Sequence, residues 1–143
     1  MEINNRKARF NYHVLEEYVA GIQLIGSEVK SIREGNANIS EAFCYIKDGE
    51  IFVKNSFISK YKDASYMNHD ETRDRKLLLN KREIKSISKK TIDKGITIVP
   101  LKIFELNGKF KMKIAVVKGK KDWDKRNTIK SRDIKRDLDR FYK

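Results

Sequence analysis

The sequence predicts a mainly antiparallel β fold whose short strands close, fully or partly, into a small barrel. Two observations support this prediction: an Asp-Gly turn and an Asn-Gly turn each join two β-rich apolar runs, and helical patterns are few. Closure would also remove exposed sheet edges. With 39% hydrophobic residues in 143, the chain can bury a core of its own. We expect one compact body.

The first half of the chain contains three of the expected elements. Residues 12–25 predict a long bent strand, with Gly21 and Gly26 as its bend or end points. Residues 27–35 have the pattern of a short helix that ends at a glycine. Residues 43–53 predict a hairpin around the Asp-Gly turn.

The second half predicts a helix and a longer hairpin. Residues 80–83 resemble a capping box at a helix start, and Gly95 would end that helix. Its buried face would consist of Ile84, Ile87 and Ile92. Residues 97–117 form the hairpin around Asn-Gly, and Pro100 implies an edge or a bulge. After the turn, inward apolar residues alternate with outward lysines: Phe110, Met112, Ile114 and Val116 against Lys109, Lys111 and Lys113.

The charge is strongly basic and unevenly distributed. The net charge is +13, with +6 in the last 26 residues and +7 in the preceding 117. Such an excess attracts phosphate backbones, because neutralising phosphates releases condensed counterions. We therefore divide the chain into an RNA-binding body, residues 1–117, and a basic tail, residues 118–143. The tail's narrow stripe of Ile134, Leu138 and Phe141 predicts a helix that is disordered alone and folds against a polyanion.

Catalytic groups are scarce. The two histidines are interpreted as a structural residue in the first strand, His13, and a loop residue, His69, that either touches RNA or caps its loop. Asp122 and Asp124 are flanked by cations and are interpreted as counter-charges rather than Mg²⁺ ligands. Cys44 is expected to be a small packed residue in a strand. No cofactor, metal site or enzyme activity is predicted.

The sequence also predicts where in the cell the protein acts. No apolar run approaches 18 residues, and the N-terminus lacks the apolar region of a signal peptide. A single cysteine suits a reducing cytoplasm. Three stretches combine cations with amides or aromatics, as RNA-binding surfaces do, while a solvated charged face remains the alternative for each: residues 4–12, residues 72–81 and the tail.

Six ordered motifs identify a family resemblance. They are NRKARFNY at 5–12, AGIQLIGSEVKSIREG at 20–35, NISEAF at 38–43, TRDRKLLLNKREI at 72–84, GITIVPLKIF at 95–104 and AVVKGKKDWDKR at 115–126. In this order they resemble the SsrA-binding protein family, small protein B, the partner of transfer-messenger RNA. The resemblance covers nearly the whole chain.

The resemblance implies a six-stranded antiparallel barrel of the oligonucleotide-binding type with about three helices. It implies a non-catalytic adaptor that grips the tRNA-like domain of transfer-messenger RNA and enters stalled ribosomes with it. That RNA, carried by the elongation factor that delivers aminoacyl-tRNA, then becomes a surrogate message encoding a degradation tag. The tail would approach the decoding centre of the small subunit and fold in the empty mRNA channel.

The resemblance also assigns residues. Leu78 and Asn80 match the family's RNA-binding face, although Asn80 is also the natural cap of the next helix. Val19 stands where the family commonly has an acidic residue, and either Glu17 or Glu28 compensates or the contact is absent. Further expected phosphate contacts are Arg6, Lys7, Arg73, Arg75 and Lys76. In the tail, Trp123 is expected to stack on a ribosomal base, beside Gly119, Lys120, Lys121, Asp124, Lys125 and Arg126.

Three other interpretations remain open. The first is a general RNA-binding or ribosome-associated module without a rescue role. The second is an RNA-modifying or RNA-cleaving enzyme that uses the histidines or the aspartate pair. The third is membrane-surface binding through the tail, whose apolar stripe is narrow for that purpose.

Overall fold

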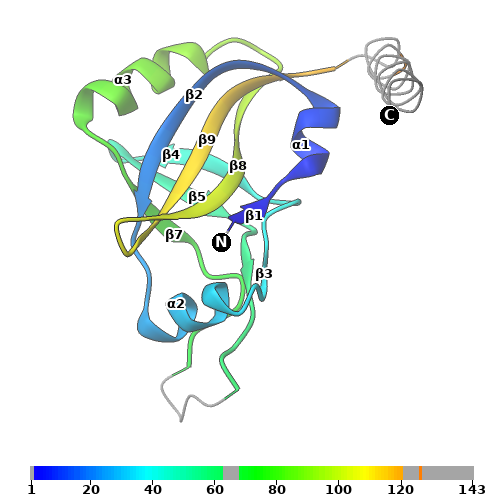
Figure 1. Cartoon of the computed structure of the whole chain (residues 1–143). Coiled ribbons are helices and arrows are strands. Elements are labelled where there is room, and N and C mark those ends of the chain that lie inside the picture. The colour runs from blue at the N-terminus through cyan, green and yellow to red at the C-terminus, as the bar shows by residue number, and fades with distance from the viewer. Residues whose placement is uncertain (1, 63–67, 121–125, 127–143) are drawn as a thin grey trace.

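The computed structural model describes residues 2–62, 68–120 and 126 (Figure 1). Within these ranges the chain is mainly β, with three helices. The elements in chain order are β1 (Glu2–Asn4), α1 (Arg6–Asn11), β2 (Tyr12–Ile22), α2 (Gly26–Arg33), β3 (Ala37–Asn38), β4 (Phe43–Lys47), β5 (Glu50–Lys54), β6 (Phe57–Ile58), β7 (Arg75–Leu78), α3 (Lys81–Lys90), β8 (Ile96–Leu106) and β9 (Lys109–Gly119).

Six strands form a closed ring. Their order is β8-β4-β5-β7-β2-β9, and β9 pairs back with β8, every pair being antiparallel. The short strand β1 adds to β8, while β3 and β6 make a separate two-stranded sheet. Figure 1 shows α2 and α3 at opposite ends of the ring, with α1 at its side. The expected six-stranded antiparallel arrangement with about three helices is confirmed.

Both predicted hairpins are present, with two-residue turns. Asp48 and Gly49 have φ of 53° and 75°, and Asn107 and Gly108 have 52° and 76°. Positive φ at both central residues matches the right-handed twist of the flanking strands, and Asn-Gly and Asp-Gly adopt it at low cost. Pro100 coincides with a register shift in β8, so of the two expected alternatives, an edge or a bulge, the structure supports the bulge.

The core lies inside the ring, and a second apolar cluster lies outside it. Phe110, Met112 and Ile114 are buried as the alternating pattern of β9 predicts. The second cluster forms where α1 covers the outer faces of β8 and β9. Neither α1 nor β1 was expected from the sequence. The outer cluster is Ala8, Val99, Leu101, Ala115 and Val117.

The two expected helices of the body are confirmed, but two expected positions at the end of the second are wrong, because Thr91 rather than Gly95 caps it and Ile92 lies beyond it. After α2, Gly35 adopts φ of 78° and its N–H bonds to the Ile32 carbonyl, which ends the helix as predicted. The helix α3 begins with the predicted capping box but ends at Lys90. Ile92 therefore lies beyond the helix and is 80% exposed, so its predicted place on the buried face is wrong.

Strand structure continues past residue 117, where the tail was expected to begin. Strand β9 continues to Gly119, which pairs with Tyr12, while Lys118 pairs with both His13 and Ile96. The backbone N–H of Lys120 then donates to the Asn11 carbonyl at 2.8 Å. Hydrogen bonding therefore continues three residues past the expected boundary after residue 117. The expected tail helix lies outside the described residues, apart from Arg126.

We expect Ile87→Ala and Ile92→Ala to have very different effects on stability. Ile87 is 0% exposed and Ile92 is 80% exposed. Removing the buried side chain should lower the free energy of unfolding by about 2–5 kcal/mol, because it leaves a cavity. The exposed substitution should change it by less than about 0.5 kcal/mol. Urea unfolding of both variants measures this; equal effects would contradict the described end of α3.

Candidate nucleic-acid interface

Leu78 and Asn80 lie together where β7 leads into α3. Leu78 ends β7 with 53% of its side chain exposed, and Asn80 is also exposed. The Asn80 Oδ1 accepts a hydrogen bond from the Glu83 N–H at 2.8 Å, and the Glu83 carboxylate accepts one from the Asn80 N–H at 3.3 Å. Within the described part of the chain, the Asn80 amide nitrogen donates to no protein group. Capping therefore uses the acceptor and leaves the donor available.

Val19 and the two acidic residues expected to compensate for it, Glu17 and Glu28, occupy different environments. Val19 is 47% exposed on β2, opposite Lys113. Glu17 lies beside it on the surface, with its Oε2 3.3 Å from the Lys113 Nζ. Glu28 is 0% exposed in α2, so its carboxylate is not available to compensate at the surface.

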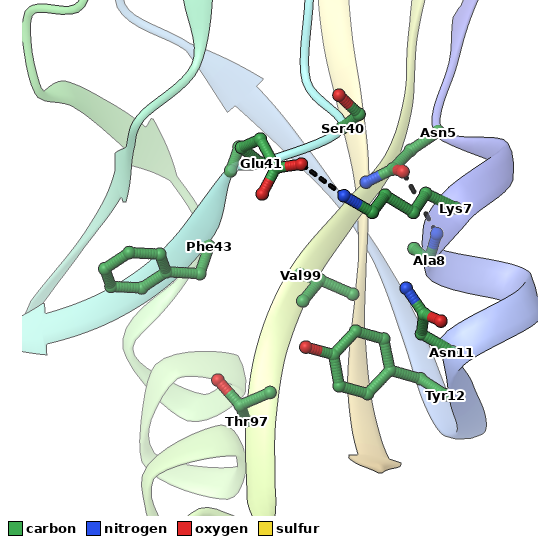
Figure 2. Close-up of a pocket in the computed structure, with 11 residues that line it drawn as sticks. Asn5, Lys7, Ala8, Asn11, Tyr12, Ser40, Glu41, Phe43, Thr97 and Val99 are labelled. Atoms are coloured by element: carbon green, nitrogen blue, oxygen red, sulfur yellow. Dashed lines mark hydrogen bonds and ion pairs between the residues drawn. The ribbon is translucent and has the colours of Figure 1, made fainter. Parts of the chain in front are cut away.

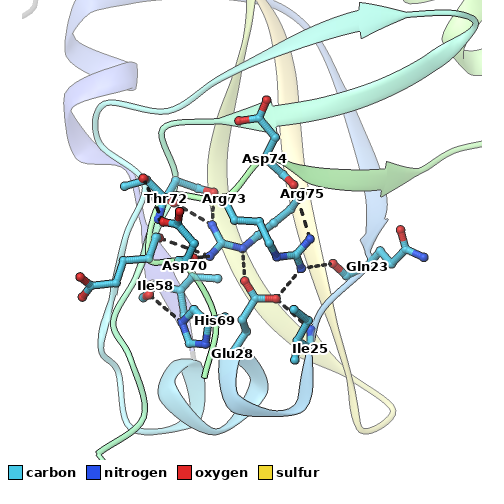
Figure 3. Close-up of polar contacts among 12 residues, drawn as sticks. Gln23, Ile25, Glu28, Ile58, His69, Asp70, Thr72, Arg73, Asp74 and Arg75 are labelled. Carbon is cyan, nitrogen blue, oxygen red and sulfur yellow. Dashed lines mark hydrogen bonds and ion pairs between the residues drawn. The ribbon is translucent and has the colours of Figure 1, made fainter. Parts of the chain in front are cut away.

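The buried carboxylate of Glu28 holds two of the arginines expected to bind phosphate (Figure 3). Its Oε1 accepts from the Ile25 N–H at 2.8 Å and from the Arg73 Nη2 at 2.6 Å. Its Oε2 accepts from the Arg75 Nε. Burial is the largest effect on the Glu28 pKa and raises it, but the hydrogen bonds from Arg73, Ile25 and Arg75 together outweigh burial and lower the pKa.

Arg75 has no free donor in this arrangement. Its side chain is 1% exposed. Besides the Glu28 contact, Nη1 donates to the carbonyl and hydroxyl of Ser56 at 2.7 and 2.9 Å. Nη2 reaches the carbonyls of Asp70 and Glu71 at 3.4 and 3.3 Å. All of its donors are therefore occupied, and we remove Arg75 from the expected phosphate contacts.

The neighbouring cations remain accessible. The side chain of Arg73 is 29% exposed, and its guanidinium is oriented by Glu28 and by the Gln23 carbonyl at 3.3 Å. The Lys76 side chain is 35% exposed, with its Nζ 3.5 Å from the Glu50 carboxylate. Exposed ion pairs of this kind contribute about 0–1 kcal/mol. A phosphate can therefore replace the Glu50 carboxylate at Lys76 at little cost, whereas a phosphate at Arg73 would have to bind beside the buried Glu28 without displacing it.

His69 is a structural residue of the same region. It is 3% exposed, with Nδ1 2.7 Å from the Ser27 hydroxyl and Nε2 2.9 Å from the Ile58 carbonyl. Since a carbonyl only accepts, Nε2 donates the proton. Both ring nitrogens are used within the protein, which supports the loop-capping alternative over contact with RNA.

At the N-terminus the structure separates residues that the sequence placed in one basic stretch. Arg6 is exposed, and Lys7 pairs with the exposed carboxylate of Glu41 beside a polar cavity of about 240 Å³ (Figure 2). Asn5, in contrast, is 3% exposed and caps α1 through its bond from the Ala8 N–H at 3.1 Å. Its amide also donates to the carbonyls of Ile39 and Pro100.

Part of the tail assignment can be placed. Gly119 ends β9, the Lys120 Nζ lies 3.3 Å from the Arg9 carbonyl, and Arg126 is exposed. The other assigned residues lie outside the described ranges: Lys121, Trp123, Asp124 and Lys125. So do Asp122 of the aspartate pair and the apolar stripe of the tail.

In residues 2–62, 68–120 and 126, no cluster of His, Cys, Asp and Glu side chains is placed to hold a metal ion, and no helix has the length and apolarity needed to cross a membrane. Cys44 is 4% exposed, and burial raises the pKa of its thiol far above the ordinary value. This supports the expected packing role and opposes a role as nucleophile.

Comparisons with known proteins cover most or all of the chain and agree with one another. A model of the SmpB protein family matches residues 2–143. The SsrA-binding protein of Christiangramia forsetii is 48% identical over 100% of this chain and 92% of its own length. The SsrA-binding protein of Persephonella marina is 51% identical over 97% of this chain and 91% of its own length. A solved structure described as "tmRNA-SmpB: a journey to the center of the bacterial ribosome" matches with 43% identity and a TM-score of 0.71, covering 85% of each chain.

We expect two substitutions of Asn80 to separate capping from RNA contact. Asn80→Ser retains a capping oxygen, so its free energy of unfolding should differ from wild type by less than about 0.5 kcal/mol. Asn80→Ala loses the cap, so its free energy of unfolding should fall by about 1 kcal/mol. Both remove the amide donor and should weaken RNA binding. Urea unfolding and RNA titration measure the two effects. Wild-type RNA affinity in Asn80→Ser would restrict the residue to capping.

We expect Glu28→Gln to give a stability loss that depends on pH. Because the folded-state pKa of Glu28 is lowered, the carboxylate contributes stability above its ordinary value of 4.5, and this contribution is lost as pH falls through the folded pKa. Near pH 7 the substitution should cost about 3–5 kcal/mol, because it leaves buried cationic groups without their partner.

The measurement is urea unfolding of wild type and variant from pH 7 to pH 3. The difference between them should shrink below pH 4.5. The exposed pair of Lys7 and Glu41 supplies the control, since Glu41→Gln should cost less than about 1 kcal/mol. A Glu28 effect as small as the control would show that the buried network contributes little.

Proposed function

The chain belongs to the SmpB protein family, and from this premise we propose that it binds the tRNA-like domain of transfer-messenger RNA and delivers that RNA to stalled ribosomes. The family match over residues 2–143 is the observation that carries the proposal. The relatives' name, SsrA-binding protein, and the tmRNA-SmpB ribosome structure support both the RNA and the ribosome as partners.

The exposed surface supports a binding role. Leu78 provides an apolar contact, and Asn80 provides a free amide donor. Arg73 and Lys76 provide cationic groups that solvent can reach. Apolar, amide and cationic groups together recognise bases, sugars and phosphates of RNA that is not in a regular duplex. We assign this surface, with Arg6 and Lys7 as further contacts, to transfer-messenger RNA.

The tail takes the second part of the proposed division of labour. Residues from Lys121 onward would probe the decoding centre and the empty mRNA channel of the small subunit, with Trp123 stacking on a ribosomal base. A channel filled with message leaves no space for this segment. The elongation factor that carries aminoacyl-tRNA would act as an indirect partner, through the RNA.

We propose an adaptor without catalysis that acts in the cytoplasm, where ribosomes translate. Buried Cys44 and His69 are the best nucleophile and base candidates of the body, and both are engaged in packing or internal hydrogen bonds. The protein would supply binding energy and shape, while the ribosome performs peptidyl transfer.

We expect the full chain to bind transfer-messenger RNA more tightly than ordinary tRNA at matched salt. The matched salt concentration is essential, because phosphate contacts make affinity fall steeply as salt rises. Filter binding or fluorescence titration with both RNAs measures the ratio. Equal affinities would favour the rival function, a general RNA-binding or ribosome-associated module.

We expect truncation after Lys120 to retain RNA binding and to abolish tagging on stalled ribosomes. This end point keeps the pairing of Gly119 with Tyr12 and the Lys120 hydrogen bond to Asn11, both of which truncation after Val117 would remove. RNA titration and an in vitro tagging reaction measure the two activities. Loss of RNA binding in a folded truncated protein would refute the division between body and tail.

A further inference from the structure

A groove lies beside Leu78 at the turn between β8 and β9. Its volume is about 330 Å³, and its apolar lining includes Ile22, Leu24 and Leu78. Its cationic lining is Lys109 and Lys111. Pockets of about 300 Å³ and above hold small ligands. The groove is therefore large enough for a compact group such as a single nucleotide.

Gly21 allows Leu78 to occupy one wall of this groove. The two residues are opposite each other in the β2–β7 ladder. A Cβ at position 21 would lie 3.2 Å from the Leu78 Cβ and 3.4 Å from its Cδ1. The φ of Gly21 is outside the left-handed region, so close approach rather than backbone conformation explains the glycine. The side chain of Leu78 on β7 thus lies directly beside the backbone of Gly21 on β2.

The two lysines of the groove differ from other cations on the same strands. On β8, Lys102 pairs with Glu2, and on β9, Lys113 pairs with Glu17. Within the described ranges, Lys109 and Lys111 form no ion pair. Lys111 is also the residue opposite Gly21 in the β2–β9 ladder, while Leu78 is opposite Gly21 in the β2–β7 ladder. Lys111 and Leu78 therefore flank Gly21 on its two neighbouring strands. The groove therefore joins an exposed apolar wall to unneutralised positive charge.

We propose that this groove is a subsite for one unstacked nucleotide of single-stranded RNA. The base or ribose contacts Leu78 above Gly21, and the phosphate is bound by Lys109 and Lys111. Charge decides the occupant: Lys109 and Lys111, which form no ion pair among the described residues, favour a phosphate-bearing ligand over a neutral one. The subsite rests on the proposed function and adds Gly21, Lys109 and Lys111 to it.

The test measures affinity of the full chain for the tRNA-like domain at several salt concentrations. For Lys109→Ala combined with Lys111→Ala, the slope of log affinity against log salt should become shallower by about 0.7–0.9, as expected for one lost phosphate contact. For Leu78→Ala, affinity should fall about 10- to 100-fold at every salt concentration with the slope unchanged. The two variants therefore report on separate parts of the nucleotide.

Matched controls come from the loop between α3 and β8. Lys94→Ala removes an exposed lysine and Ile92→Ala an exposed apolar side chain, both away from the groove. Lys94→Ala should leave the slope within about 0.3 of wild type, since it removes no phosphate contact. Ile92→Ala should leave affinity within twofold. An unchanged slope in the lysine variant, or a Leu78→Ala affinity equal to that of Ile92→Ala, overturns the subsite.

Gly21→Ala tests the positioning of Leu78. Gly21→Ala should lower the affinity for RNA without changing the slope of log affinity against log salt. Combined with Leu78→Ala, it should lower the affinity little further, because both substitutions act on one contact. Additive losses would show that Gly21 does not act through Leu78. If Gly21→Ala fails to fold, the lysine and leucine variants decide the proposal. Wild-type protein that does not distinguish the RNA from ordinary tRNA would refute the proposed function instead.

Discussion

The carboxylate of Glu28 is the contact on which the RNA-facing region depends. It joins the start of α2 to β7, because it accepts from the Ile25 backbone and from two arginines at once. Through Arg75 the same network holds the carbonyls of the loop before β7. Leu78 and Asn80 follow directly on this strand, so the buried ion pair of Arg75 and Glu28 helps to fix their positions. The carboxylate of Glu28 and all donors of Arg75 have partners, which fixes one geometry, although the buried Nε of Arg73 has no hydrogen-bond partner among the described residues.

The sequence predicted the parts of the fold that are encoded locally. Positive φ at Asp48-Gly49 and Asn107-Gly108, the bulge at Pro100 and the box of Asn80 with Glu83 each arise within a few residues. Helix α1 was missed because six residues with few apolar positions carry no helical period, and its stability comes from Ala8 packing on β8 and β9. Ile92 was misplaced because its spacing continues the helical period, although the helix ends two residues earlier.

The candidate site shows the same division between local and non-local information. The exposure of Leu78 and the capping by Asn80 agree with positions that motifs alone assigned. Arg75 was assigned to phosphate by residue type, because its sequence neighbours are basic and polar. Its true partners, Glu28 and Ser56, are 47 and 19 residues away in the chain, and no spacing rule connects them. Gly21 was likewise interpreted only as a bend or end point of its strand, whereas its close approach to Leu78 on another strand could not be read from the sequence.

Burial, rather than residue type, therefore determines which cations can meet RNA. Arg75 would have to abandon an enclosed carboxylate, whereas Lys7 and Lys76 share theirs with solvent. Leaving an exposed partner costs about 0–1 kcal/mol, and leaving Glu28 uncompensated costs several times more. A net charge of +13 consequently overstates the charge offered by the body to a phosphate backbone. Arg75 is therefore used entirely by the fold, whereas Arg73 both binds Glu28 and keeps 29% of its side chain exposed.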